Sequence, residues 1–230
     1  MKFIYLHGFA SRPESAKAIY LREAFAALQI PLEVPDLNQD DFSHLTITRQ
    51  LSQVAKMLPL DGTPVTLIGS SLGGLTSAWL AQRHSQVQRL VLLAPAFGFL
   101  SHWLPKLAED QLREWRSSGY LSVYHYGEGR SLPLHYKFVE DASQYQETQL
   151  LRPVPTLILH GRNDQVIPIQ ASRDYASVRP WVQLIELESD HALIDVMPKI
   201  WEEIQVFCEL SRDKGFFLKQ TGLTHRREIW

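Results

Sequence analysis

The stretch "LIGSSLGG", residues Leu67–Gly74, decides the fold of this 230-residue chain. A short apolar run ends here in a glycine-flanked turn, and a helical pattern follows it. Residues Gly69–Gly73 match G-x-S-x-G, which between a strand and a helix holds its central serine in a strained, exposed turn. The central residue is Ser71. Centring the motif on Ser70 would place an isoleucine and a leucine at the flanking positions, where bulky side chains would collide as the strand turns back into the helix.

Two other interpretations of this turn are a phosphate-binding loop and a purely structural turn. A phosphate-binding P-loop needs Lys-Ser/Thr directly after its last glycine. Here Gly74 is followed by Leu75 and Thr76, so the phosphate interpretation fails. The motif alone does not exclude a purely structural turn. A serine hydroxyl is a weak nucleophile until a base takes its proton, so a nucleophile would also need a base elsewhere in the chain.

Short apolar runs alternate with helical patterns along the chain, as expected for a mostly parallel sheet buried on both faces. Residues Ser11–Glu14 contain a serine, a proline and a glutamate spaced as a capping box for the first helix. We therefore predict an α/β fold with six core strands, ordered 2-1-3-4-5-6, and helices on both faces. The predicted strands cover residues 2–6, 32–34, 65–69, 89–94, 156–160 and 182–188, and the helices cover 14–28, 43–58, a segment from 72 and one near 198.

Residues 97–151 interrupt this alternation, because they contain no run typical of a buried strand. Long insertions between strands are commonly functional, so we predict a lid, with a hairpin that turns at Gly127–Gly129. A local extension of the core is the alternative. The insertion is rich in aromatic residues, and we expect Trp103, Trp115 and Tyr124 to line an apolar pocket.

The best candidate for a general base is His191 in "ESDHALID", between the last predicted strand and the last predicted helix. A base of this kind needs an acid that orients its ring and stabilises the imidazolium. Asp164 in "LILHGRNDQVIP" follows a predicted strand and is our first choice. Asp190, Asp195 and Asp36 remain alternatives. The order Ser, Asp, His is that of α/β-hydrolases.

A tetrahedral oxyanion would also need backbone donors. We expect one from the N–H of Leu72, at the start of the helix that follows Ser71. The loop after the first strand, "YLHGFAS", supplies the second from the N–H of Phe9, since Gly8 lets the backbone pass close to a substrate. His7 is interpreted as a loop-packing residue. The similar step His160–Gly161 is interpreted as structural.

Composition excludes several other classes of function. The net charge of −2 and the absence of a basic cluster argue against nucleic-acid binding. The single cysteine, Cys208, cannot form an internal disulfide, and the start "MKFIYLHGF" is too short in apolar residues for a signal or a membrane span. We expect a cytoplasmic protein without metal or cofactor, since no metal spacing or dinucleotide motif occurs. The tail after Leu210 is expected to be a surface appendage.

The segments "YLHGFASRPESAKA" and "IGSSLGG" resemble the YqiA-type esterases of the α/β-hydrolase superfamily. This resemblance spans the opening, the serine turn and the Asp and His loops. It implies Ser71 as nucleophile, Asp164 and His191 as its partners, and activity on short-chain acyl esters. The insertion is longer than expected for that family. Its sequence "GYLSVYHYGEG" and the loop "LHGRNDQVIP" are similar to α/β-hydrolases that cleave acyl glucuronides and palmitoyl thioesters, which implies bulkier acyl groups.

Taken together, the sequence predicts a single α/β-hydrolase domain over residues 1–230, with the lid at about 97–151. The expected function is a carboxylesterase that cleaves a small-molecule acyl ester or thioester through an acyl-enzyme. A thioesterase or a C–C bond hydrolase on the same scaffold is an alternative, as is a non-catalytic interaction protein with this fold. The sequence sets neither the natural acyl group nor the oligomeric state.

Overall fold

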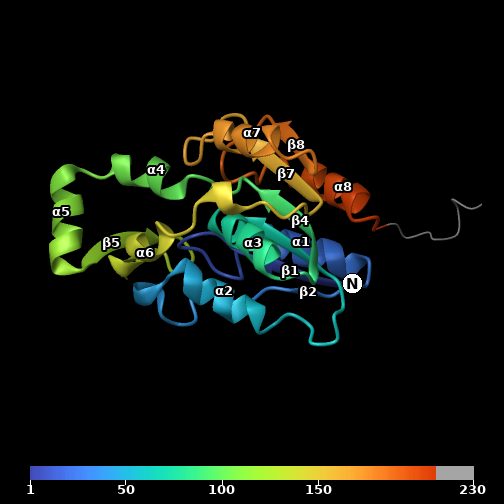
Figure 1. The fold of residues 1–230 in the computed structure, drawn as a ribbon, viewed down its shortest axis with the longest axis horizontal. Coiled ribbons are helices and arrows are strands. Elements are labelled where there is room, and N and C mark those ends of the chain that lie inside the picture. The colour runs from blue at the N-terminus through green and yellow to red at the C-terminus, as the bar shows by residue number, and fades with distance from the viewer. Residues whose placement is uncertain (211–230) are drawn as a thin grey trace, which may run out of the picture.

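The computed structural model describes residues 1–210, in which six parallel strands form one sheet. Their order is β2-β1-β3-β4-β7-β8, which confirms the predicted order and the mostly parallel pairing (Figure 1). The tail expected as a surface appendage lies outside the described residues. The strands are β1 (Lys2–Leu6), β2 (Leu32–Glu33), β3 (Val65–Ser70), β4 (Val87–Leu93), β7 (Thr156–Gly161) and β8 (Val182–Leu187).

Helices cover both faces of the sheet, as predicted (Figure 1). Strands β3 and β7 are buried along their whole length, which explains why each contains consecutive apolar residues and no charged side chain that points to solvent on alternate positions. One face packs against α2 (Ile47–Ala55), α3 (Leu72–Arg83) and α7 (Ile169–Ser177). The other face packs against α1 (Ala16–Ala27) and α8 (Met197–Phe207). Within residues 1–210, no helix has the length and apolar character needed to cross a membrane.

The predicted capping box at the start of the first helix is wrong. Helix α1 begins at Ala16, and its N-cap is Ser15, which makes no capping hydrogen bond through its side chain. Ser11 lies in the loop before the helix, where its carbonyl accepts a hydrogen bond from the side chain of Asn38 at 2.8 Å. The serine–glutamate spacing therefore falls in a loop that is held by the segment after β2.

The insertion lies between β4 and β7 and projects beyond the sheet (Figure 1). Its two strands pair antiparallel, which confirms the predicted hairpin, and the turn between them contains Gly127 and Gly129. The inward side chains Leu121, Val123, Leu132 and Leu134 pack against the main core, and the ring of His125 is also buried. The elements of the insertion are α4 (Phe99–Trp103), η2 (Leu104–Lys106), α5 (Glu109–Ser118), β5 (Tyr120–His125), β6 (Arg130–His135), α6 (Lys137–Ala142) and η3 (Glu147–Gln149).

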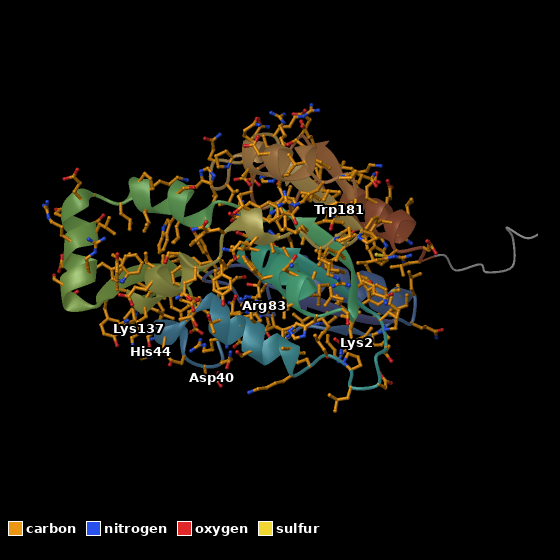
Figure 2. The ribbon with its side chains drawn as sticks, in the orientation of Figure 1. Lys2, Asp40, His44, Arg83, Lys137 and Trp181 are labelled. Atoms are coloured by element: carbon orange, nitrogen blue, oxygen red, sulfur yellow. The ribbon has the colours of Figure 1, made fainter. Side chains whose placement is uncertain are left out.

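The insertion is held against the rest of the chain at several points. Arg12 donates to the carboxylate of Glu128 in the hairpin turn at 2.6 Å. The short helix η1 (Phe42–His44) lies beside β6, and the ring of His44 stacks on that of His135 with 6.0 Å between the centroids. Figure 2 labels His44, which lies on the side of the molecule where the insertion projects.

Two glycines of the serine turn are required by backbone packing. A Cβ atom on Gly73 would overlap the carbonyl oxygens of Leu6 and His7 at the end of β1. A Cβ atom on Gly69 would overlap the carbonyl of Gly73 and the hydroxyl of Ser77. The start of α3 therefore lies directly against the backbone of β1, which is possible only because both residues lack a side chain.

We expect Gly73→Ala to destabilise the protein by roughly 1–3 kcal/mol more than Gly74→Ala, because a methyl group forced into a packed backbone costs about that much. Both substitutions lie in α3, so each variant gains the same helix propensity of about 1 kcal/mol, and this gain cancels in the comparison. At Gly74 the new methyl group would lie 3.1–3.2 Å from Cβ and Cα of Pro95 and from the carbonyl oxygen of Gly69, which is a tight contact rather than the overlap found at Gly73. Urea denaturation of the two variants measures the difference, and equal stabilities would contradict the backbone constraint.

Candidate active site

Ser71 occupies the turn between β3 and α3 and has φ 51° and ψ −117°. A non-glycine residue in this region is strained, and such strain persists only where the surrounding structure enforces it. Here the N–H of Ser71 donates to the carbonyl of Leu93 at 2.9 Å, which ties the turn to β4. The side chain of Ser71 is half-buried, whereas Ser70 is buried as the last residue of β3.

The structure brings Ser71, His191 and Asp164 together in one line of contacts. Nε2 of His191 lies 3.1 Å from Oγ of Ser71, and Nδ1 lies 2.7 Å from Oδ2 of Asp164. An ionised carboxylate only accepts hydrogen bonds, so Nδ1 carries the ring proton and Nε2 can accept from the serine hydroxyl. This arrangement matches a nucleophile, a base and an acid that orients the base.

Asp164 is held ionised by its hydrogen bonds. Burial of its side chain would by itself raise the pKa of the carboxyl, but hydrogen bonds from His160 and His191 more than offset this effect. The pKa of Asp164 therefore lies well below its usual range. Its second oxygen, Oδ1, accepts from the backbone N–H groups of Val166 and Ile167, each at 2.8 Å.

The three alternative acids lie in other hydrogen bonds. Asp190 accepts from the backbone N–H of Ala192 at 2.8 Å and so shapes the loop that carries the histidine. Asp195 accepts from the hydroxyl of Ser189. Asp36 lies 3.4 Å from Nε2 of His7 and accepts from the backbone of Asn38. Among the four acids considered, Asp164 is the one in hydrogen-bond contact with His191.

The two segments that carry the predicted backbone donors lie next to Ser71. Leu72 is the first residue of α3, where N–H groups have no partner inside the helix. Gly8, directly before Phe9, approaches Ser71 so closely that a Cβ atom on it would lie 3.3 Å from Cβ of the serine. The loop that carries Phe9 is fixed by the buried ring of His7, whose Nε2 accepts from the N–H of Leu37 at 2.9 Å.

The sequence did not reveal that His160 contacts Asp164. The ring is fully buried near the end of β7, and its Nε2 lies 3.0 Å from Oδ2 of Asp164. From the sequence alone, the His160–Gly161 step is interpreted as structural because it is similar to the His7–Gly8 step. The short distance along the chain to Asp164, four residues, was the signal that could have revealed this contact.

Lys17, in the "SAKA" segment, is a second residue near the site to which the sequence motifs assign no role. Its Nζ donates to the carbonyl of Ala192 at 2.7 Å and so ties the start of α1 to the residue after His191. Burial lowers the pKa of Lys17 to about 8, against the opposing influence of Asp190 and Asp164.

The three aromatic residues expected to line a pocket have different surroundings. Trp115 has no exposed surface, and its indole N–H donates to the carbonyl of Leu134 at 2.8 Å, so it belongs to the interior of the insertion and does not line an open pocket. Tyr124 is 52% exposed, because alternate side chains of β5 point away from the core. Trp103 is half-buried, and its ring centroid lies 5.3 Å from that of Phe9.

Phe9 is the centre of an aromatic cluster that joins the serine loop to the insertion. Its ring contacts four others, with centroid distances of 5.3–5.7 Å, namely Phe42, Phe99, Trp103 and Phe138. A separate cavity of about 640 Å³ lies between η3 and α7 and is lined by Phe97, Leu150 and Tyr175 among others. Ser71, Asp164 and His191 do not line that cavity.

The chain belongs to the uncharacterised protein family UPF0227, whose model matches residues 2–208. This match confirms the resemblance to the YqiA-type family, and its range runs through the insertion. A comparison of the sequence with curated proteins finds no match.

Solved structures with a similar fold are α/β-hydrolases. A putative hydrolase from Agrobacterium vitis S4 has a TM-score of 0.79 and 24% identity, over 90% of this chain and 87% of that chain. Mouse alpha/beta hydrolase domain-containing protein 10 has a TM-score of 0.73 and 23% identity, over 91% and 90%. Est1E from Butyrivibrio proteoclasticus, solved with ferulic acid bound, has a TM-score of 0.73 and 20% identity, over 90% and 88%. The predicted α/β-hydrolase fold is thereby confirmed.

The lowered pKa of Asp164 predicts a loss of stability in acid. Because the unfolded carboxyl has a higher pKa, of about 3.9, the contribution of Asp164 is complete above that pH and is lost as the pH falls toward the lowered value. Each unit of lowering corresponds to about 1.4 kcal/mol. Asp164→Asn should therefore show a shallower fall in the free energy of unfolding between about pH 6 and pH 2.

Urea denaturation across this pH range measures the slope, with Asp40→Asn as the control because Asp40 is exposed. A slope equal to that of the wild type in Asp164→Asn would contradict the assignment of Asp164 as a buried, ionised group.

Proposed function

We propose that this protein is a serine hydrolase, and specifically a carboxylesterase. The observation that carries the proposal is the line of contacts from Oγ of Ser71 through the ring of His191 to Oδ2 of Asp164. It is supported by the strained backbone at Ser71, by the α/β-hydrolase fold and by two backbone segments that converge beside the serine.

In the first half of the proposed reaction, Nε2 of His191 takes the proton of the Ser71 hydroxyl as Oγ attacks the ester carbonyl carbon. The carbonyl oxygen becomes an oxyanion, which the N–H groups of Leu72 and Phe9 stabilise. His191 then gives its proton to the alcohol oxygen as the C–O bond breaks. Asp164, which stays ionised, stabilises the imidazolium that exists between these two proton transfers.

In the second half, water replaces the alcohol. His191 removes a proton from the water molecule as its oxygen attacks the acyl carbon, and the oxyanion forms again beside Leu72 and Phe9. Collapse of this intermediate releases the carboxylic acid, and the proton returns from His191 to Oγ of Ser71. The cycle therefore uses this chain's own groups and one water molecule.

The acyl group of the substrate is proposed to be apolar and to enter beside Phe9 and Trp103. These two half-buried rings lie where the insertion meets the serine loop. If the rings move apart, an acyl chain can pack between them in place of their contact with each other. Est1E, which has the same fold, was solved with ferulic acid, an aromatic acid, in its structure. We therefore propose that the insertion acts as a lid that selects apolar or aromatic acyl groups.

Substitution of the nucleophile tests the proposed activity. Ser71→Ala should abolish hydrolysis of p-nitrophenyl esters and labelling by a fluorophosphonate probe, since loss of a nucleophile lowers kcat by about 10⁶-fold in enzymes of this type. Ser70→Ala is the matched control, because it removes the neighbouring hydroxyl and should keep both activities. Loss of labelling in Ser70→Ala with full labelling in Ser71→Ala would reverse the assignment, and an unlabelled wild type would favour a non-catalytic role.

A chain-length series of p-nitrophenyl esters tests the proposed acyl site. Wild type should prefer butyrate and octanoate over acetate in kcat/KM, because each buried methylene contributes about 0.8 kcal/mol, or roughly fourfold. Trp103→Ala should reduce this preference, whereas Tyr124→Ala should leave it unchanged because Tyr124 faces outward. A preference for acetate in the wild type would contradict an extended acyl site.

A further inference from the structure

The line of contacts through Ser71 continues into the protein interior beyond Asp164. Five polar side chains form one chain of hydrogen bonds, in the order Ser71, His191, Asp164, His160 and Ser172. We propose that His160 is a positioning residue that fixes Asp164 and weakens the proton affinity of the base, His191. This inference rests on the proposed serine hydrolase function and extends it by two residues for which neither a motif nor the family gives a role.

The protonation of His160 follows from its partners. Nε2 lies 3.0 Å from Oδ2 of Asp164 and 3.0 Å from the carbonyl oxygen of Ile167, and both of these atoms only accept hydrogen bonds. Nε2 therefore carries a proton. Nδ1 lies 2.7 Å from Oγ of Ser172, whose hydroxyl can donate to it. A neutral ring with its proton on Nε2 satisfies every contact, which suits a side chain with no exposed surface.

His160 completes the hydrogen bonding of the carboxylate. Oδ2 of Asp164 accepts from both imidazole rings, while Oδ1 accepts from two backbone N–H groups. A carboxylate has about four lone-pair sites, so Asp164 is fully satisfied and held in one orientation. The side chain has no exposed surface, so water cannot replace a donor that is lost.

The second imidazole also has an electrostatic consequence for the first. A hydrogen bond from His160 draws negative charge of the carboxylate toward the interior and leaves less of it to stabilise a proton on His191. The other titratable groups near this carboxylate are His191 and Lys17, and Lys17 also interacts with the carboxylate of Asp190. These groups are unchanged when His160 is replaced, so the effect of the donor can be measured separately.

A residue that only packed at the end of β7 would not need an imidazole with a hydrogen-bond partner for each nitrogen. The position is fully buried between strands β4 and β8, where the neighbouring residues Leu157, Ile158 and Leu159 are apolar. An imidazole there must find a partner for each nitrogen or lose free energy. Both partners are present, and one of them is the carboxylate that also accepts from His191, which links this buried side chain to the proposed base.

The test is the pH dependence of kcat/KM for p-nitrophenyl butyrate in three variants of the full chain. His160→Leu removes the donor, whereas His160→Gln can keep an N–H near the position of Nε2. Ser172→Ala removes the hydroxyl that holds Nδ1. Ser177→Ala, an exposed serine in the same helix α7, is the matched control for Ser172→Ala.

We expect the midpoint of the acidic limb in His160→Leu to move to higher pH by about one unit, because the carboxylate then stabilises the protonated base more strongly. His160→Gln should restore most of the wild-type profile, and Ser172→Ala should shift it in the same direction by a smaller amount. The rate of fluorophosphonate labelling should show the same shifts, and Ser177→Ala should match the wild type.

The proposal is overturned if all variants lower the rate while their acidic limbs coincide with that of the wild type, since a structural role would give that result. If His160→Leu does not fold, as judged by circular dichroism, the profiles of His160→Gln and Ser172→Ala decide, and two unshifted profiles overturn it. Failure of the proposed function is a separate result, because the wild type would then not be labelled at Ser71 at all.

Discussion

The close approach of helix α3 to the end of strand β1 is the constraint on which the candidate site depends. Gly73 has no room for a side chain against the carbonyls of Leu6 and His7, so the helix must start within contact distance of the loop after β1. This approach puts Gly8, the residue before the proposed donor Phe9, beside Ser71. The strained φ of Ser71 is the local cost of turning from strand to helix in so little space.

The parallel sheet provides the rest of the arrangement. Strands β3, β7 and β8 run in the same direction, so the loops after them leave the sheet at one edge. Ser71, Asp164 and His191 follow these three strands in turn, which explains how residues up to 120 positions apart in the chain come within hydrogen-bond distance. The hydrogen bonds from Lys17 to Ala192 and within the Asp190 turn then hold the histidine loop against this edge.

Much of this arrangement could be predicted because it follows from sterics and periodicity. The apolar runs indicated the strands, the α/β alternation indicated the fold class, and the flanking glycines distinguished Ser71 from Ser70. Features that depend on contacts far apart in the sequence could not be predicted. The apparent capping box at Ser11 is a loop contact to Asn38, and the aromatic content of the insertion did not reveal that Trp115 is wholly interior.

His160 illustrates the limit of reasoning from motifs. A histidine before a glycine at the end of a strand occurs twice in this chain, and the two rings have different partners. His7 accepts from the backbone of Leu37 and so fixes the loop that carries Phe9. His160 contacts the carboxylate of Asp164, because the turn after β7 brings residue 164 back over residue 160. The same dipeptide therefore supports the backbone on one side of Ser71 and the acid on the other, and only the partner atoms distinguish the two roles.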